Sequence, residues 1–313
     1  MGHLSKSLLA VVLSLLFVVP SAFSVSPVEA DDTLRVVFVG DLLLDRGVRD
    51  RIGMHGVDSL FSPSVDSLFA SSDCVVANME CPATKVVKPV QKWIIFRAEP
   101  EWLAPLQRHG ITHLNLANNH SIDQGREGLM STIDNILETG MTPIGAGANM
   151  QEAAKPVLLA EHPRKVWILP SQRLSLENFP YLPDRPCVSQ EEFPQLLQRV
   201  ERLRESYPES VIIVTLHWGG ENTMKPILQQ VAEAHQLVNA GADIIIGHHS
   251  HTMQTVEIFK GKPIYYSIGN FIFDARRPFH DKACAVMMDI SADSVSVSTI
   301  PISINDCVPQ VDK

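Results

Sequence analysis

Side chains that can bind metal ions or transfer protons follow five separate apolar segments of the chain. Carboxylate, amide and imidazole groups are the ligands that hard and borderline cations take in proteins, and imidazole and carboxylate groups also act as acids and bases. Metal-assisted chemistry is therefore the reaction class that these residue types indicate. In chain order the groups are Asp41; Asn78 and Glu80; Asn118, Asn119 and His120; His217 and Glu221; and His248, His249 and His251.

Each group also has a purely structural interpretation. A Gly-Asp pair such as the one that contains Asp41 is usually a turn, residues 118–120 would suit a helix cap, and His217 could be a hydrogen-bonded core histidine. The strongest single signal is residues 247–251, Gly-His-His-Ser-His, because three histidines in four positions are costly to bury without partners. The five groups together favour a metal site.

The segments before these residues read as strands that alternate with helices. Apolar runs predict strands at residues 34–39, 74–79, 112–117, 165–169, 211–216 and 243–246. Helical periodicity with Gly and Pro stops predicts helices at 57–71, 100–109, 128–139, 189–206 and 225–239. Ser189 and Glu192 form a capping-box pattern for the fourth helix. The proline-rich residues 170–194 predict a long surface loop that leads into this helix.

The last third of the chain changes character. It reads as strands at residues 255–259, 264–267, 283–290 and 295–300, with 260–263 as a turn. This order predicts an α/β fold with a mixed sheet in one domain. Because ligands of α/β proteins bind beyond the carboxyl ends of the strands, the five polar groups are expected to meet at one edge.

The composition and charge of the chain indicate a globular protein and argue against some classes of function. The chain has 313 residues, 45% hydrophobic and 19% charged, which is typical of a globular protein with a substantial core. Its 26 Lys and Arg against 35 Asp and Glu give a net charge of -9. This charge argues against a nucleic-acid partner, which would need a basic face. The five cysteines, an odd number, predict no disulfide framework.

The N-terminus has the pattern of an export signal. Residues 8–19 are almost wholly apolar, follow Lys6, and are shorter than the roughly 20 residues of a membrane-spanning helix. Cleavage is expected after Ala30, which would leave residues 31–313 as the mature domain. No second apolar span follows, so the protein is expected to be periplasmic or secreted without a transmembrane segment. The alternative is an uncleaved N-terminal anchor with the domain outside the cytoplasm.

Six motifs occur in order at residues 38–41, 77–82, 116–120, 216–219, 247–251 and 266–271, with Asp123, Gly125 and Glu221 close by. The chain thereby resembles the CapA family of bacterial capsule-synthesis proteins linked to poly-γ-glutamate, whose fold is similar to the calcineurin-like metallophosphoesterases. Residues 96–98 and 144–147 also match. The resemblance covers about residues 34–275 and implies an α/β four-layer αββα sandwich with mixed sheets.

The resemblance also implies roles for single residues. The metal ligands would be Asp41, Glu80, Asn119, His217, His249 and His251, with Glu80 as the bridging carboxylate. The catalytic residues would be His120 as proton or hydrogen-bond donor, Asp123 as its orienting partner, and Glu221 as a general base or a substrate contact. The substrate contacts would be Asn78, Arg97, His248 and Asn270, although Arg97 could equally form a surface ion pair. One or two divalent ions, manganese, iron or zinc, would be bound.

The chain departs from the metallophosphoesterase pattern at two positions. The histidine that usually stands two residues after the first aspartate is Leu43 here, and the bridging aspartate is Glu80. One metal position is therefore short of a ligand. Asp45, Glu221 or water could fill the gap, or only one metal ion would bind firmly.

Two functions follow from these residues. The first is a metal-dependent hydrolase that cleaves a phosphoester or a γ-glutamyl amide bond in an envelope polymer. The second is a non-catalytic accessory protein that binds an acidic polymer or a partner in the polymer synthesis or export machinery. Fold alone does not choose between them.

Overall fold

The computed structural model describes residue 1 and residues 33–176 and 179–312. From residue 33 onward these residues form one compact unit. The predicted signal sequence, apart from Met1, lies outside the described residues. Among the residues described, no helix has the length and apolar character needed to cross a membrane.

Within the described ranges the strands form two large mixed sheets and a short ribbon. The first sheet has the order β15 (Val308–Val311), β14 (Val295–Asn305), β13 (Lys282–Ile290), β1 (Leu34–Leu42), β2 (Cys74–Met79), β3 (His113–Asn115) and β4 (Thr142–Ile144). The second has the order β11 (Val256–Phe259), β12 (Lys262–Tyr265), β10 (Ile244–His248), β9 (Val211–His217), β7 (Val166–Gln172) and β6 (Val157–Ala160). The ribbon pairs β5 (Ala146–Gly147) with β8 (Cys187–Val188).

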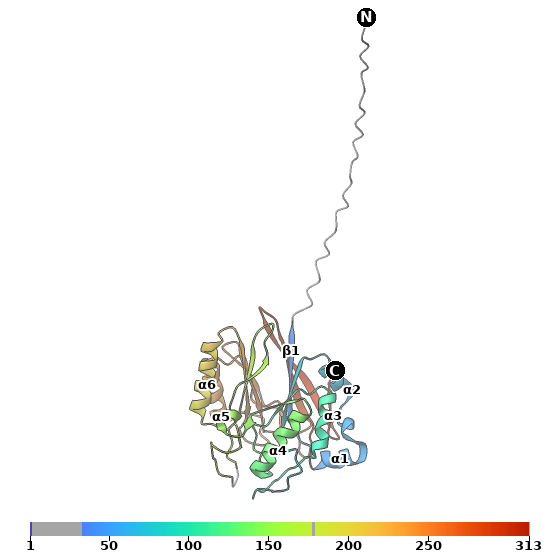
Figure 1. The fold of residues 1–313 in the computed structure, drawn as a ribbon. Helices are drawn as coiled ribbons and strands as arrows, with labels where there is room; N and C mark the ends of the chain where they lie inside the picture. Colours follow the sequence, from blue (N-terminus) through green and yellow to red (C-terminus); the bar gives the residue numbers. More distant parts are fainter. Residues whose placement is uncertain (2–32, 177–178, 313) are drawn as a thin grey trace. The chain divides into compact units, whose positions relative to one another are not determined.

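Helices cover the outer face of each sheet (Figure 1). Against the first sheet lie α1 (Gly47–His55), α2 (Pro63–Ala70), α3 (Leu103–Arg108) and α4 (Gly125–Glu138). Against the second lie α6 (Phe193–Ser206) and α7 (Leu228–Ala240). The short α5 (Met150–Ala153) packs on the ribbon. The predicted four-layer αββα sandwich is thus confirmed.

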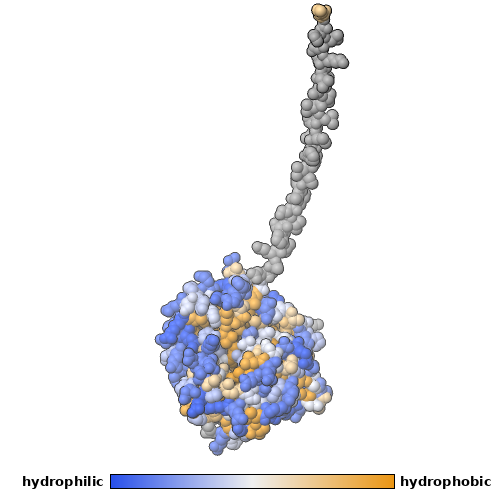
Figure 2. All heavy atoms as spheres, in the orientation of Figure 1, coloured by the Kyte–Doolittle hydropathy of each residue, from blue (hydrophilic) through white to orange (hydrophobic). Residues whose placement is uncertain are grey.

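Strand β1 shows why the central strands are apolar on both faces. Val36 and Phe38 point into the core between the two sheets, whereas Val37 and Val39 pack against the helices. A strand buried on both sides has no polar face, so its sequence reads as a continuous apolar run. On the outside of the domain, hydrophilic residues surround scattered hydrophobic ones on the face that Figure 2 shows.

Several predicted helix boundaries differ from the structure by a few residues, and two of the differences have a clear local cause. The helix predicted at 57–71 divides into a 3-10 turn (Val57–Leu60) and α2, because Pro63 occupies the first turn of α2 and Ser62 caps it through a bond from Val65 N. The predicted Ser189 cap is also wrong, because Ser189 Oγ donates to Pro170 O. The capping box of α6 is formed instead by Glu192 and Gln195.

The predicted loop 170–194 is partly ordered into strands. β7 continues to Gln172, and Cys187 and Val188 pair with β5. The chain also forms short elements that periodicity did not indicate, among them α1 and β15. All five cysteines lie among the described residues as buried free thiols.

We predict that Gly40→Ala destabilises the fold. A Cβ atom at Gly40 would lie 2.0 Å from the backbone oxygen of Gly269, which itself accepts a hydrogen bond from Asp41 N. Backbone cannot move aside as cheaply as a side chain, so the free energy of unfolding should fall by about 3 kcal/mol. Urea unfolding followed by tryptophan fluorescence measures this change.

The matched control is Gly53→Ala in α1. A Cβ atom there meets nothing within 4 Å. The substitution should raise the free energy of unfolding by roughly 0.5–1 kcal/mol, since Ala has the better helix propensity. Equal unfolding midpoints for Gly40→Ala and the wild type would contradict the close approach of β1 to residue 269.

Candidate metal centre

The predicted ligands meet at the carboxyl ends of strands from both sheets. The first sheet contributes from the ends of β1, β2 and β3, and the second from the ends of β9 and β10. In that order the residues are Asp41, Glu80, Asn119, His217, and the pair His249 and His251. Because the parallel strands of both sheets end at this edge, residues up to 210 positions apart in the sequence, Asp41 and His251, come together.

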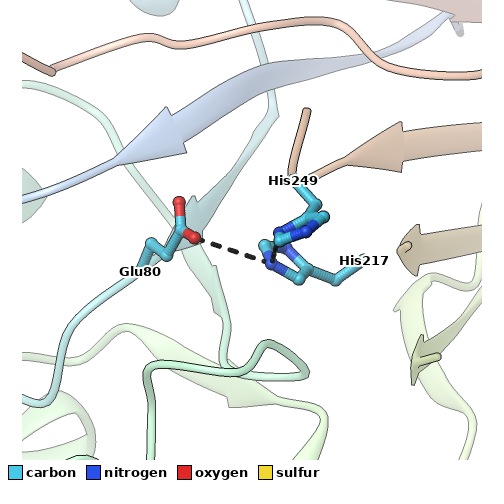
Figure 3. A group of neighbouring side chains, drawn as sticks. All are labelled: Glu80, His217 and His249. Carbon is cyan, nitrogen blue, oxygen red and sulfur yellow. Dashed lines mark hydrogen bonds and ion pairs between the residues drawn. The ribbon is translucent and has the colours of Figure 1, made fainter. Parts of the chain in front are cut away.

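The ligand atoms form two groups that share Glu80. One group is Glu80, His217 and His249, and the other is Asp41, Glu80 and His251; within each group the atoms lie within 4.8 Å of one another. Figure 3 shows the Glu80 carboxylate turned toward the imidazoles of the first group. Glu80 Oε1 lies 3.6 Å from His217 Nε2, and Oε2 lies 3.8 Å from His251 Nδ1. One carboxylate oxygen is therefore directed at each group.

Asn119 adds an amide oxygen to the first group. Its Oδ1 lies 2.8 Å from His217 Nε2, which in turn lies 3.1 Å from His249 Nδ1. In the second group Asp41 Oδ2 lies 3.2 Å from His251 Nδ1. The structure thus brings all six predicted ligands into one cluster.

A bound cation would satisfy the Glu80 carboxylate better than the side chains that surround it. It is 1% exposed, and neither oxygen has a hydrogen-bond partner among the described residues. A buried carboxylate without partners is costly, and metal coordination is one of the ways in which proteins satisfy it. Burial accordingly raises the pKa of Glu80 to about 8. The mixed oxygen and imidazole donors suit manganese, iron or zinc.

The histidines differ in charge. Burial lowers the pKa of His217 well below its usual value and, with the nearby charge of His251, lowers that of His249 to about 3. Both are therefore neutral near pH 7, which is the form that binds metals. Burial also opposes charge on His251, but the carboxylates of Glu80 and Asp41 outweigh it and raise its pKa to about 9.

Three predicted substrate contacts surround the ligands. Asn78 Nδ2 donates to Asp41 Oδ1 at 2.8 Å and lies 3.2 Å from His217 Nδ1. Asn270 Oδ1 lies 3.0 Å from His251 Nδ1, and His248 Nδ1 lies 3.4 Å from Asp41 Oδ1. All three are buried, and such partners orient metal ligands. Direct contact of these residues with a substrate stays a prediction.

His120 lies beside the cluster in a polar network of its own. Its Nδ1 lies 2.8 Å from Asp123 Oδ2, and Asp123 is fully buried. Lys92, whose side chain is 4% exposed, lies 2.9 Å from Asp123 Oδ1 and donates to the backbone oxygen of Asn119 at 2.8 Å. Burial lowers the pKa of His120 despite the adjacent Asp123. Sequence reasoning missed Lys92, because it follows a stretch with no periodicity.

A comparison with models of known protein families identifies the family of the chain. Residues 35–275 match the model of the bacterial capsule synthesis protein PGA_cap. The chain belongs to this family. It is 31% identical over 248 residues to the PGA biosynthesis protein CapA of Bacillus subtilis, covering 78% of this chain and 64% of that protein. It is 28% identical to the capsule biosynthesis protein CapA of Bacillus anthracis, covering 97% of this chain and 76% of that protein.

Solved structures support the fold independently. The NAD nucleotidase of Haemophilus influenzae superposes with a TM-score of 0.53 over 87% of this chain and 52% of that protein. The sequence identity is 13%, so this similarity concerns the fold alone.

The structure shows why neither Leu43 nor Asp45 supplies the missing ligand. Leu43 is fully buried in the apolar core of the first sheet and offers no donor atom. Asp45 is not a substitute in this arrangement, because its carboxylate accepts hydrogen bonds from Arg49 Nε at 3.0 Å and Arg97 N at 2.9 Å.

The Arg97 guanidinium, a predicted substrate contact, lies outside the cluster and bonds to Glu99 at 2.6 Å. These contacts match the ion-pair alternative for Arg97.

A cleft of about 230 Å³ opens beside the ligands. Among the predicted residues, His120, His251 and the exposed Glu221 line it. Phe96, part of the matching segment 96–98, also lines it, and sequence reasoning missed Arg46, Phe273 and His280. No local pattern marks these residues, because they come from loops and element ends far apart in the chain.

We predict that the affinity for a divalent cation rises with pH and that binding releases protons. At pH 7 Glu80 and His251, with pKa values of about 8 and 9, both hold protons that a cation must displace. The affinity should therefore increase by up to about tenfold per pH unit for each displaced proton. Calorimetric titration with manganese or zinc in buffers of different ionisation enthalpy counts the protons.

Glu80→Gln is the matched variant for this titration. It removes one titrating group and should release about one proton fewer than the wild type. A wild-type affinity that stays constant between about pH 6 and 9, without proton release, would contradict the charge states assigned to Glu80 and His251.

Proposed function

We propose that this chain is an exported, metal-dependent hydrolase that cleaves a phosphoester or γ-glutamyl amide bond in an envelope polymer. In this proposal residues 1–30 are a cleaved signal and residues 31–313 the mature domain. The observation that carries it is the Glu80 carboxylate, which is shared by two groups of candidate ligands and is buried with no hydrogen-bond partner among the residues that the structure describes. Membership of the capsule synthesis family supports an envelope polymer as the substrate.

The residues divide between two metal positions. Glu80, Asn119, His217 and His249 would hold one ion, and Asp41, Glu80 and His251 the other. When bound, a divalent ion lowers the pKa of water and polarises a phosphoryl or carbonyl oxygen. The second position has fewer protein ligands because Leu43 replaces the usual histidine.

The protein's own acid–base group is His120. Asp123 engages its Nδ1, so Nε2 is the ring atom left to exchange a proton with a substrate in the cleft. Lys92 balances the charge of Asp123 and thereby holds the pair in place. Glu221, at the cleft wall, would act as a second base or contact the substrate.

Leu43 favours a second candidate function. A centre that lacks one ligand could hold metal for binding rather than for turnover. The chain would then be an accessory protein that binds an acidic polymer or a partner in polymer synthesis or export. An acidic chain of net charge -9 would need the metal, or a local basic surface, to bind a polyanion.

The first test is the metal content of residues 31–313 purified without chelator. We expect one or two equivalents of a transition metal, and loss of most of it in the variant that combines His249→Ala and His251→Ala. Gly53→Ala is the control and should keep the wild-type content. No metal in the wild type, even after incubation with manganese or zinc, would contradict the proposed metal centre.

The second test is His120→Ala. Loss of acid–base catalysis should lower the rate of hydrolysis by roughly 10²–10⁴-fold while the metal content stays unchanged. A panel of phosphoesters and γ-glutamyl peptides supplies the assay and identifies the bond that is cleaved. Full activity in His120→Ala would exclude this role. Polymer binding by wild-type protein that retains metal but hydrolyses no member of the panel would favour the accessory function.

A further inference from the structure

Arg46 is held in the wall of the cleft by two aromatic rings. Its Cζ lies 5.2 Å from the centre of the Phe96 ring and 4.9 Å from that of Phe273. Phe96 packs against His120 with the ring centres 4.4 Å apart, and Phe273 packs against His251 at 4.7 Å. The guanidinium is therefore framed by the rings that also touch the acid–base residue and a metal ligand.

The cleft has an excess of positive side chains on this wall. Arg46 and Arg276 share the single carboxylate of Asp274, and Arg277 lines the same cleft. The acidic residues in its lining are Asp274 and Glu221. Three arginines thus face two carboxylates, before any charge on the histidines is counted. The hydrogen bonding of the Arg46 guanidinium is incomplete, because its Nε is buried without a hydrogen-bond partner in the part of the chain that the structure describes.

The backbone at Arg46 is strained. Its φ angle is 54°, in the left-handed region that a residue other than glycine rarely adopts. Such a conformation persists only where the surroundings enforce it, and functional sites are where it is found most often. Here Asp45 Oδ1 accepts a hydrogen bond from Arg46 N at 2.8 Å.

We infer that Arg46 forms an anion-binding subsite next to the metal centre, for ligands that carry two anionic groups. This inference rests on the proposed function, since the first anionic group would lie at the metal ligands. The second group, a carboxylate or a phosphate, would receive hydrogen bonds from the guanidinium, whose planar donors match both. The subsite makes Arg46, rather than Arg97, the arginine that determines specificity.

The test compares Arg46→Met and Arg46→Lys with the control Arg108→Met, an exposed arginine of α3 that pairs with exposed Asp58. Binding of pyrophosphate and phosphate, and of γ-glutamylglycine and glutamine, is measured by calorimetry on metal-loaded and metal-free protein; the first member of each pair carries two anionic groups and the second carries one. Arg46→Met should weaken binding of the member with two anionic groups in at least one pair by about tenfold and leave the smaller member unchanged. Arg46→Lys should retain part of the affinity, and Arg108→Met all of it.

The pair of ligands whose binding changes in Arg46→Met shows whether the subsite binds a phosphate or a carboxylate. Unchanged affinity for both larger ligands in Arg46→Met would overturn the subsite. Asp274 keeps Arg276 as its partner in this variant, so the fold should survive, and a thermal melt checks that it does. Metal content on the same samples separates the two proposals. If the wild type binds no metal, the proposed function fails, and the subsite stands only if Arg46→Met still weakens binding to metal-free protein.

Discussion

The cost of burying the Glu80 carboxylate is the constraint around which the centre is organised. Two sheets close over this residue, and no described donor reaches either of its oxygens. The metal-free protein offsets the cost by keeping a proton on Glu80 and a positive charge on His251, between Glu80 and Asp41. A divalent cation would replace the positive charges of these two protons, so the desolvation that makes the Glu80 carboxylate costly to bury also favours metal binding.

The centre lies across the junction of the two sheets, so its geometry depends on how the sheets pack. Asn78 links them directly, because its amide donates to Asp41 of the first sheet and lies against His217 of the second. Asn119 and His217 make another contact between them. Behind these polar links the apolar core between the sheets, with Phe38 and Ile246 among its members, sets the distance that separates the two ligand sets. A shift of one sheet would disturb both groups of candidate ligands together.

The surroundings of the centre divide into two kinds. Buried amides and the Asp123–Lys92 pair hold ligands and His120 in place, and they lie where water is excluded. The cleft beside them is lined by aromatic rings and arginines, and two of the rings, Phe96 and Phe273, also pack against His120 and His251. Under the proposed function, this division would separate the residues that build the metal centre from those that select its ligand, which is how one fold serves different functions.

The sequence by itself determined the strands, the polar residues that follow them and hence the fold class, because strand periodicity and chain order are local properties. The motif resemblance also pointed to the six residues that cluster at this edge, where the carboxyl ends of the parallel strands meet. Only the tertiary structure decided that Arg46 rather than Arg97 lines the cleft and that Lys92 pairs with Asp123. These contacts join loops that are distant in sequence, and no local propensity encodes the paths that such loops take.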